Sequence, residues 1–190
     1  MGTQSPGTVQ KTKYMLASAL MWLLEKHSFR KISVGDICQE ALVSRSAFYV
    51  HFVDKYELLK YCLESMLRLQ AEQSRGKGLE EQLMVLLESV QENQRALRNV
   101  LLADLSQEIL EITQQTFNVF VRERLERLEA EGMELPGPIQ LLTAFYAGGL
   151  ANIILCWIQE DFATPREVVA RCQSNMILSL LGAERAGKAP

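Results

Sequence analysis

Apolar residues recur at intervals of three and four along almost the whole chain, which places them on one side of an α-helix. The alternation of apolar and polar residues that is typical of a half-buried strand is not found over any convincing length. The sequence therefore predicts an all-α protein of about nine helices. From the start and stop signals, we expect these helices at residues 8–27, 34–41, 45–52, 55–73, 79–93, 96–103, 105–131, 139–162 and 165–181.

Three capping signals lie close together near the N-terminal end of the chain. Ser33, Ser44 and Asp54 each precede a stretch with helical spacing, and each can accept a hydrogen bond from a backbone N–H of the helix that follows. Helix starts this close together leave room for only two short helices joined by a tight turn. Two such helices after a longer first helix have the arrangement of a helix-turn-helix.

The second short helix has an anchoring side and an outward side. Phe48 and Phe52 lie four residues apart, so we expect them to fix the helix to its neighbours. The helix start then presents Arg45 outward, together with Ser46 and Ala47, and an arginine fork can match the O6 and N7 edge of guanine. Two further side chains flank the apolar face and could reach phosphates; they are Tyr49 and His51.

Charge is unevenly distributed along the chain. The first sixty residues hold eight basic and five acidic side chains, an excess of three positive charges, whereas the whole chain carries −3 and the remainder therefore −6. A basic head on an acidic body suggests that the head meets a polyanion. Lys55 falls in the first turn of a helix, where a cation opposes the helix dipole, and a nearby anion would explain it.

The segment from Ser33 to Leu59 resembles the DNA-binding domain of the TetR/AcrR family. The resemblance rests on a Phe-Tyr-x-His-Phe-x-x-Lys motif that begins at Phe48 and is followed by Glu-Leu-Leu, and it extends over roughly residues 10–60. It implies a homodimer with a helix-turn-helix head at residues 1–54 and a ligand-binding and dimerisation body at residues 55–190. Double-stranded operator DNA is then the expected partner.

The resemblance also implies which residues contact DNA. These are Thr12, Lys13, Ser33, Ser44, Arg45, Ser46, Ala47, Tyr49, His51 and Lys55. Ala47 departs from the family pattern because it lacks a hydroxyl that commonly meets a phosphate. Leu42 stands at a turn position where the family usually has glycine, and a left-handed backbone there would cost a leucine about 1–2 kcal/mol. Ser28 stands where glycine commonly ends the first helix.

The later helices carry more apolar surface than one buried face needs. The stretch 145–158 has no charged residue on any side, so every side of that helix must be covered. Packing this helix and the last one across a two-fold axis would form a four-helix dimer interface. The residues expected there are Ala144, Gly148, Ala151, Leu155, Val168, Cys172 and Met176.

A pocket is the other use for this apolar surface, and a small apolar or amphipathic effector would fill it. The candidate lining residues, each of which could equally be plain core, are Met66, Phe117, Phe120, Tyr146 and Trp157. The C-terminal body also resembles an AcrR-like subgroup that includes dihydroxyacetone-kinase-type regulators.

Several other classes of protein are disfavoured. His27 and His51 are the two histidines, and no catalytic or nucleotide-binding motif occurs, so we predict neither an enzyme nor a cofactor. The four cysteines lack metal-ligand spacing and are expected to be buried or half-buried. No uncharged run of about 18 apolar residues is evident, which predicts no membrane span, and the polar N-terminus predicts a cytoplasmic protein.

The sequence thus predicts a DNA-binding transcriptional regulator, a ligand-responsive repressor that binds a palindromic operator as a homodimer. One alternative from another class stands beside it, a TetR-like interaction module or co-activator that has lost DNA binding. Leu42 and Ala47 favour the alternative. Four residues oppose it, namely Arg45, Tyr49, His51 and Lys55.

Overall fold

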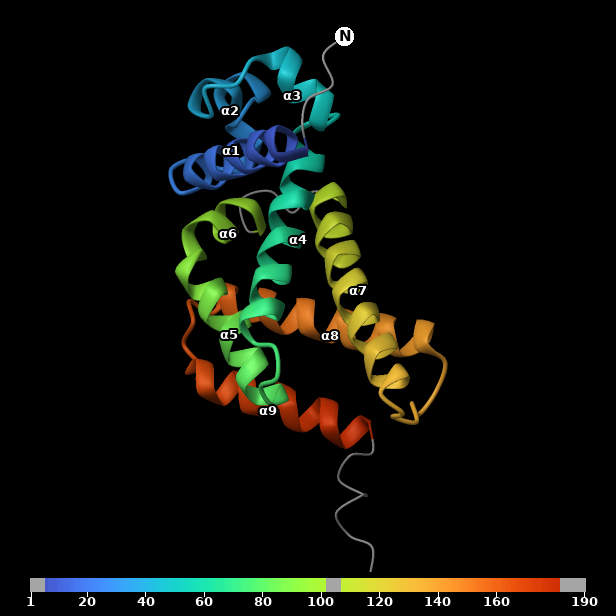
Figure 1. Ribbon diagram of the computed structural model, residues 1–190. Helices are drawn as coiled ribbons and strands as arrows, with labels where there is room; N and C mark the ends of the chain where they lie inside the picture. The colour runs from blue at the N-terminus through green and yellow to red at the C-terminus, as the bar shows by residue number, and fades with distance from the viewer. Residues whose placement is uncertain (1–5, 102–106, 182–190) are drawn as a thin grey trace, which may run out of the picture. The chain divides into compact units, whose positions relative to one another are not determined.

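The computed structural model describes residues 6–101 and 107–181, and within them the chain is all-α, as predicted. This part of the chain forms nine α-helices, which Figure 1 labels, and one 3-10 turn. Their bounds are α1 Pro6–Leu24, η1 Phe29–Lys31, α2 Val34–Glu40, α3 Arg45–His51, α4 Lys55–Gln73, α5 Leu79–Glu92, α6 Gln94–Leu101, α7 Gln107–Ala130, α8 Ile139–Gln159 and α9 Arg166–Leu180.

Two helices end three residues earlier than the sequence predicts, at 24 instead of 27 and at 159 instead of 162. Helix α1 stops at Leu24, and the unpredicted turn η1 follows it. Helix α8 stops at Gln159, because Asp161 and Phe162 have left-handed backbones, with φ of 57° and 58°. The predicted end of one helix at residue 103 and the predicted start of the next at residue 105 lie outside the described residues.

The chain forms two compact units that are each built from separate segments. The first comprises Met1–Ser65 and Asn93–Ile112, and the second comprises Met66–Glu92 and Thr113–Pro190. Helices α4 and α7 therefore each contribute to both units. A functional boundary at residue 54 remains a prediction, since it describes what each part of the chain does.

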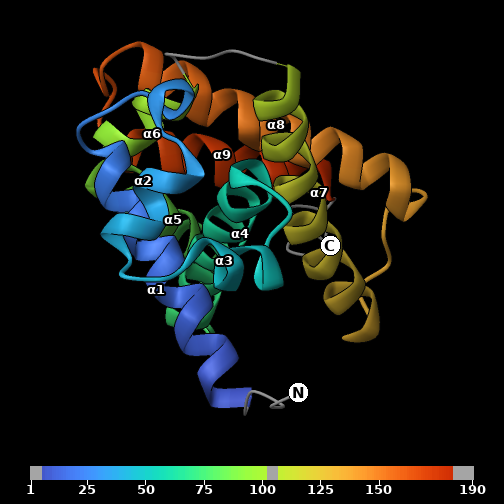
Figure 2. The same ribbon diagram turned by 90° about the horizontal axis from the view of Figure 1, so that it is seen from above.

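In the first unit, α1 packs against α2, α3 and α6, and Figures 1 and 2 both show α1, α2 and α3 grouped together. Leu16 and Leu20 of α1 are fully buried, as are Phe29 and Phe48. Asn99 of α6 donates a hydrogen bond of 2.7 Å to the carbonyl of Leu24, the last residue of α1. The end of α1 is thus stabilised by a helix that lies about seventy residues further along the chain.

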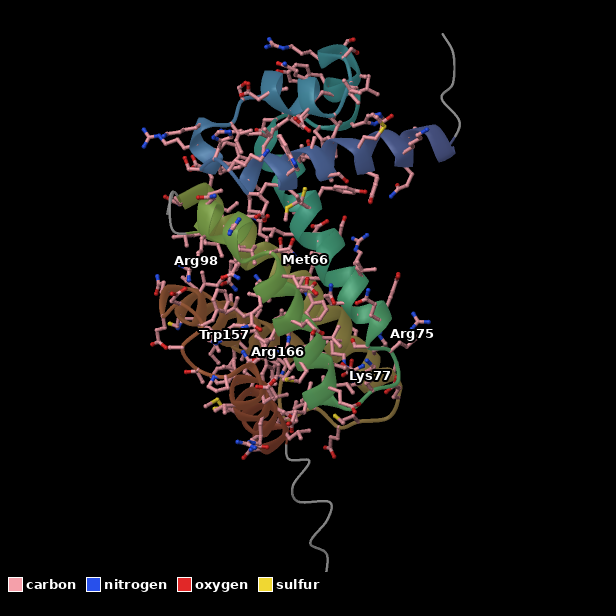
Figure 3. All side chains as sticks on the ribbon, turned by 90° about the vertical axis from the view of Figure 1, so that its left-hand side faces the viewer. Met66, Arg75, Lys77, Arg98, Trp157 and Arg166 are labelled. Carbon is pink, nitrogen blue, oxygen red and sulfur yellow. The ribbon has the colours of Figure 1, made fainter. Side chains whose placement is uncertain are left out.

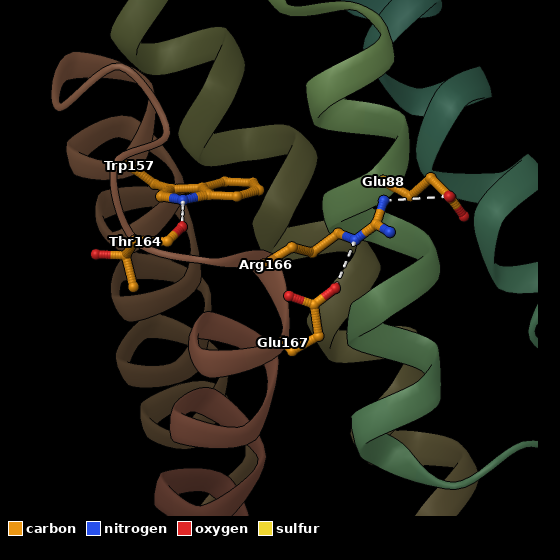
Figure 4. Close-up of polar contacts among 5 residues, drawn as sticks. All are labelled: Glu88, Trp157, Thr164, Arg166 and Glu167. Carbon is orange, nitrogen blue, oxygen red and sulfur yellow. Dashed lines mark hydrogen bonds and ion pairs between the residues drawn. The ribbon is translucent and has the colours of Figure 1, made fainter.

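In the second unit, the most extensive helix contact joins α5 and α9. Arg166 at the start of α9 pairs with Glu88 of α5 across 3.1 Å. The turn between α8 and α9 is stabilised by Trp157, whose indole N–H donates to the carbonyl of Thr164 across 2.7 Å (Figure 4). The ring of Phe162 packs edge-on against the same indole, at 4.8 Å between centroids.

The four cysteines divide into two pairs. Cys38 and Cys62 are buried, as expected, and burial raises the pKa of the Cys62 thiol to about 12. Cys156 and Cys172 are exposed, which contradicts the expectation that they are buried or half-buried. Both exposed cysteines lie on the last two helices, where the sequence leaves apolar surface without a partner inside the monomer.

The expectation that no segment could span a membrane needs correction. Within the described residues, α8 is long and apolar enough to span a membrane, because Ile139–Gln159 contains no Asp, Glu, Lys or Arg. Of its most apolar stretch, 39% is buried inside the protein. The length and composition of α8 are weak support for a membrane span, since a helix in a protein core can share them.

Candidate nucleic-acid interface

The three capping signals of the head form as predicted. Ser33 and Asp36 make a reciprocal capping box on α2, and the hydrogen bonds from the Ser33 hydroxyl and backbone N–H lower the pKa of Asp36. Ser44 accepts from the backbone N–H of Ala47 across 3.1 Å. Asp54 accepts from the backbone N–H groups that open α4. These bonds fix where α2, α3 and α4 begin.

The turn between α2 and α3 is a Schellman motif centred on Leu42. The N–H of Leu42 donates to the carbonyl of Gln39, and the N–H of Val43 donates to the carbonyl of Cys38. Leu42 has φ of 54°, so the left-handed backbone that usually requires glycine is present. Its side chain is 89% exposed. Ser28, the other departure from the family pattern, has φ of −64° and needs no glycine.

Helix α3 has one buried side and one open side. The fully buried Phe48 packs against the rings of Tyr49 and Phe52, with centroids 5.4 and 5.8 Å apart. The open side carries Arg45 and Ser46, together with Tyr49 at 59% exposure. The helix start predicted to meet base edges is therefore open to solvent in this unit.

Arg45 is folded back over the first turn of α2. A Cβ atom at Gly35 would collide with the Arg45 guanidinium, so the absence of a side chain at Gly35 makes room for it. The charge of Arg45 also contributes to the lowered pKa of Asp36. Helix α2 thus holds the long side chain of Arg45 beside the start of α3.

Two of the predicted phosphate-contacting residues have side-chain nitrogen atoms directed into the head. The Lys55 ammonium donates to the carbonyls of Phe29 and Ile32, at 2.9 and 2.8 Å, and to that of Arg30 at 3.4 Å. A phosphate contact by Lys55 would have to displace these carbonyls. His51 is half-buried, and its Nε2 lies inside the protein without a hydrogen-bond partner.

The remaining predicted DNA contacts lie on α1, at helix caps and at the start of α3. Lys13 is half-buried and stacks its ammonium over the rings of Phe52 and Tyr61, 5.6 and 5.7 Å from the centroids. Thr12 and Ala47 are also half-buried. Ser33 and Ser44 are exposed, and both hydroxyls take part in capping.

Two exposed apolar residues on the open side of the head, Val50 and Val53, were not predicted from the sequence. Val50 is 68% exposed and follows Ser46 by one helical turn, and Val53 is exposed just beyond the end of α3. The i, i+4 spacing from Ser46 to Val50 would have placed Val50 on the outward face. Apolar side chains can contact the thymine methyl group in the major groove.

The five predicted effector-lining residues all belong to the second unit. Phe117, Tyr146 and Trp157 are buried, whereas Met66 and Phe120 are half-buried. Figure 3 shows Met66 on α4 and Trp157 on α8. Burial raises the pKa of the Tyr146 phenol.

The predicted dimer residues lie on the outer sides of α8 and α9. Ala144, Val168, Cys172 and Met176 are exposed, and a second set is half-buried, namely Gly148, Ala151 and Leu155. Two further exposed apolar residues of α8 were not among those predicted from the sequence; they are Leu141, 68% exposed, and Phe145, 63% exposed. Leu141, Phe145 and Gly149 follow one another at intervals of four residues, so helical spacing would have placed all three on one face of α8.

Two known protein families match this chain, one in its N-terminal part and one in its C-terminal part. Residues 16–62 match the family described as bacterial regulatory proteins, tetR family, and residues 77–179 match the family described as transcriptional regulator C-terminal region. The second match alone covers more than half of the chain.

One curated relative and many solved structures are similar to this chain. The relative, an HTH-type dhaKLM operon transcriptional activator DhaS of Lactococcus lactis subsp. lactis (strain IL1403), is 31% identical over 94 residues, which cover 49% of this chain and 50% of the relative. This match thus spans about half the length of the curated relative.

Among solved structures, a TetR transcriptional regulator from Streptococcus agalactiae 2603V has a TM-score of 0.61 at 26% identity, over 90% of this chain and 95% of that chain. A dihydroxyacetone kinase operon activator DhaS has a TM-score of 0.62 at 19% identity, over 90% and 97% of the two chains. At its lower identity, the second structure supports the fold alone.

Proposed function

This chain belongs to the TetR family of DNA-binding transcriptional regulators, and from that premise we propose that it is an effector-responsive repressor that binds a palindromic operator as a homodimer. In this proposal, residues 1–54 read DNA, and residues 55–190 bind the effector and hold the dimer together. The observation that carries the proposal is the open side of α3, where Arg45, Ser46 and Tyr49 are exposed beside the exposed Val50.

The chemistry of this surface fits a major groove. The groove admits an α-helix, and the small Ser46 lets the helix backbone approach the bases. Arg45 can donate two hydrogen bonds to guanine, and Val50 can contact a thymine methyl group. Arg45 would have to leave its place over Gly35 to do so, and it can, because a long arginine side chain has many rotamers.

The dimer would present two such surfaces to two half-sites. Half-sites on one face of DNA lie one helical turn apart, so the two-fold axis of the protein would match the symmetry of the operator. The exposed sides of α8 and α9 carry apolar side chains, among them Phe145 and Met176, which supports their use as the interface. An effector that binds one arrangement of the dimer more tightly would shift the equilibrium toward it and release DNA.

A gel-shift titration with DNA from upstream of the chain's own gene tests the proposal. We expect binding by the wild type, and Arg45→Ala should weaken it by about 1–3 kcal/mol and relax the preference at one base pair, because a bidentate contact to guanine is lost. Arg75→Ala is the matched control, since Arg75 is an exposed arginine in the turn after α4 (Figure 3). Equal affinities of wild type and Arg45→Ala for every sequence would contradict the role of Arg45.

Activation is the second candidate function. The curated relative is a transcriptional activator, and one of the similar structures is that of an operon activator. An activator or co-activator could also act through a protein partner, for which the exposed apolar residues Leu42, Val50 and Val53 offer a surface. A reporter gene behind the same upstream DNA separates the two, because deletion of a repressor raises expression and deletion of an activator lowers it.

A further inference from the structure

Arg45, the residue proposed to read guanine, rests against the first turn of α2. A Cβ atom at residue 35 would overlap Nη2 of Arg45 and lie 3.3 Å from its Cζ, so the guanidinium fills the space left by the missing side chain of Gly35. Gly35 is half-buried, whereas Arg45 is exposed. The guanidinium therefore lies at the surface, over the start of α2, although its residue opens α3.

Two charge effects place the guanidinium on the same side of α2. The hydrogen bonds of the capping box lower the pKa of Asp36 most, and the charges of His27 and Arg45 lower it further. Burial raises the pKa of the Cys38 thiol, and the charge of Arg45 opposes that rise. Gly35 and Cys38 are three residues apart and share one side of the helix. Arg45 thus lies along the side of α2 that carries these two residues.

The position over Gly35 holds Arg45 only weakly. A cation over the first turn of a helix opposes the helix dipole, and the carboxylate of Asp36 compensates for part of this cost. Within the described residues, the guanidinium of Arg45 has no hydrogen bond and no ion pair. A guanine would offer it two acceptors, O6 and N7, that this position lacks. The arginine can therefore leave α2 when such a base is presented.

We propose that Gly35 is a positioning residue that sets how tightly and how selectively Arg45 reads DNA, because it provides the position that Arg45 occupies in the free head. This proposal rests on the proposed function, in which Arg45 reads guanine. The apparent affinity of a protein for its ligand falls with the fraction of molecules that are not in the binding arrangement. A side chain at residue 35 would remove the position over α2 and raise that fraction.

The same competition bears on base selectivity. At a base pair without the guanine acceptors, Arg45 can stay over Gly35 while the head binds, so that loss of this position brings no gain. At the matching base pair, Arg45 must leave α2, and loss of the position removes the cost of leaving. A side chain at residue 35 should therefore sharpen the discrimination at one base pair and leave the rest of the operator unaffected.

Gel-shift titration of full-length Gly35→Ala tests the proposal. We expect it to bind the upstream DNA about two- to fivefold more tightly than the wild type, the range typical of a weak exposed charge contact. The second probe is the same DNA with one base pair replaced, namely the pair at which Arg45→Ala relaxes the preference. On that probe, Gly35→Ala and the wild type should have equal affinities.

The matched control is Gly35→Ala combined with Arg45→Ala. The combined variant should bind both probes as Arg45→Ala alone does, because the arginine that Gly35 positions is absent. Alanine is also a better helix former than glycine, so Gly35→Ala should raise the Tm in both backgrounds. A merely structural effect of this kind would change the affinities for both probes, with or without Arg45.

A measurement without DNA follows the arginine directly. The charge of Arg45 contributes to the lowered pKa of Asp36, so departure of the guanidinium from α2 should raise this pKa. NMR titration of the Asp36 carboxyl group should give the same rise in Gly35→Ala as in Arg45→Ala. The combined variant should show no additional rise.

Four results would overturn the proposal: unchanged or weaker binding of the upstream DNA by Gly35→Ala, an equal gain on the replaced base pair, a gain that persists without Arg45, or an Asp36 pKa in Gly35→Ala equal to that of the wild type. A wild type that does not bind the upstream DNA would instead reject the proposed function. The Asp36 titration would still decide whether Gly35 positions Arg45.

Discussion

Leu42 shows how one residue can be held in a conformation that it disfavours. Its left-handed backbone closes the turn of the helix-turn-helix, and its side chain is almost fully exposed, so burial gives little in return. The strain is maintained by the two backbone hydrogen bonds of the Schellman motif and by the packing of α2 and α3.

We expect Leu42→Gly to stabilise the protein by about 1 kcal/mol, since glycine adopts this backbone without steric cost and part of the gain is lost to its greater freedom when unfolded. For a chain of this size, the Tm should rise by about 2–4 °C. Calorimetry measures the effect, and Leu42→Ala is the control because alanine keeps the Cβ atom. An equal rise in both variants would mean that removal of the exposed side chain is responsible.

At this scale, the sequence predicted caps and core residues better than contacts of long side chains. Ser33, Ser44 and Asp54 were identified correctly because a cap depends on neighbours within four residues. The carbonyl partners of Lys55 lie more than twenty residues away, and the unpaired amide of Gln173 depends on the packing around it. Such contacts cannot be predicted from local spacing.

Lys55 connects two elements of the head. Its ammonium at the start of α4 binds the carbonyls of the η1 turn, and it also stacks over the ring of Phe29 at 4.6 Å from the centroid. These carbonyls offset the unfavourable position of a cation at a helix N-terminus. The sequence predicts an anion beside Lys55, and within the head its ammonium binds a set of backbone dipoles.

We expect Lys55→Met to lower the free energy of unfolding by about 1.5–3 kcal/mol, because charge-assisted hydrogen bonds to part-buried carbonyls are lost. Urea denaturation measures this, with Lys31→Met, an exposed lysine of η1, as the control. The slope of operator affinity against salt should stay unchanged. A slope smaller by about one ion would instead show that Lys55 contacts a phosphate.

Element types and starts were predicted more successfully than element ends. Periodicity predicted nine helices, but the 3-10 turn was missed because three residues carry no periodic signal. The end of α8 was placed too late, since Asp161 and Phe162 do not resemble the glycine that usually stops a helix. That end is fixed by Trp157, which contacts Phe162 and Thr164 only after the turn has formed.

At the scale of the whole molecule, α8 leaves apolar residues exposed in the single chain. Its outer side presents Leu141 and Phe145, followed by the exposed Gly149 and Cys156, with no charged residue among them. The outer side of α9 adds Val168 and Met176. A second copy of the chain across a two-fold axis would cover both helices at once.

We expect Phe145→Glu to shift the protein from dimer to monomer, because each subunit would place a charge in an apolar interface. Sedimentation velocity measures the change, and operator affinity should fall with it, since one head contacts only one half-site. Val119→Glu is the control, as Val119 is an exposed apolar residue of α7. Persistence of the dimer in Phe145→Glu would place the interface elsewhere.

The interleaving of the two compact units limits how this protein can be recombined with its relatives. Helices α4 and α7 continue from one unit into the other, and α6 packs against α1 although it begins about forty residues after residue 54. A chimera that exchanges residues 1–54 alone would set a foreign α1 against the native α6. A functional transplant of operator specificity should therefore carry Asn93–Ile112 along with the N-terminal segment, or alter only the exposed side chains of α3.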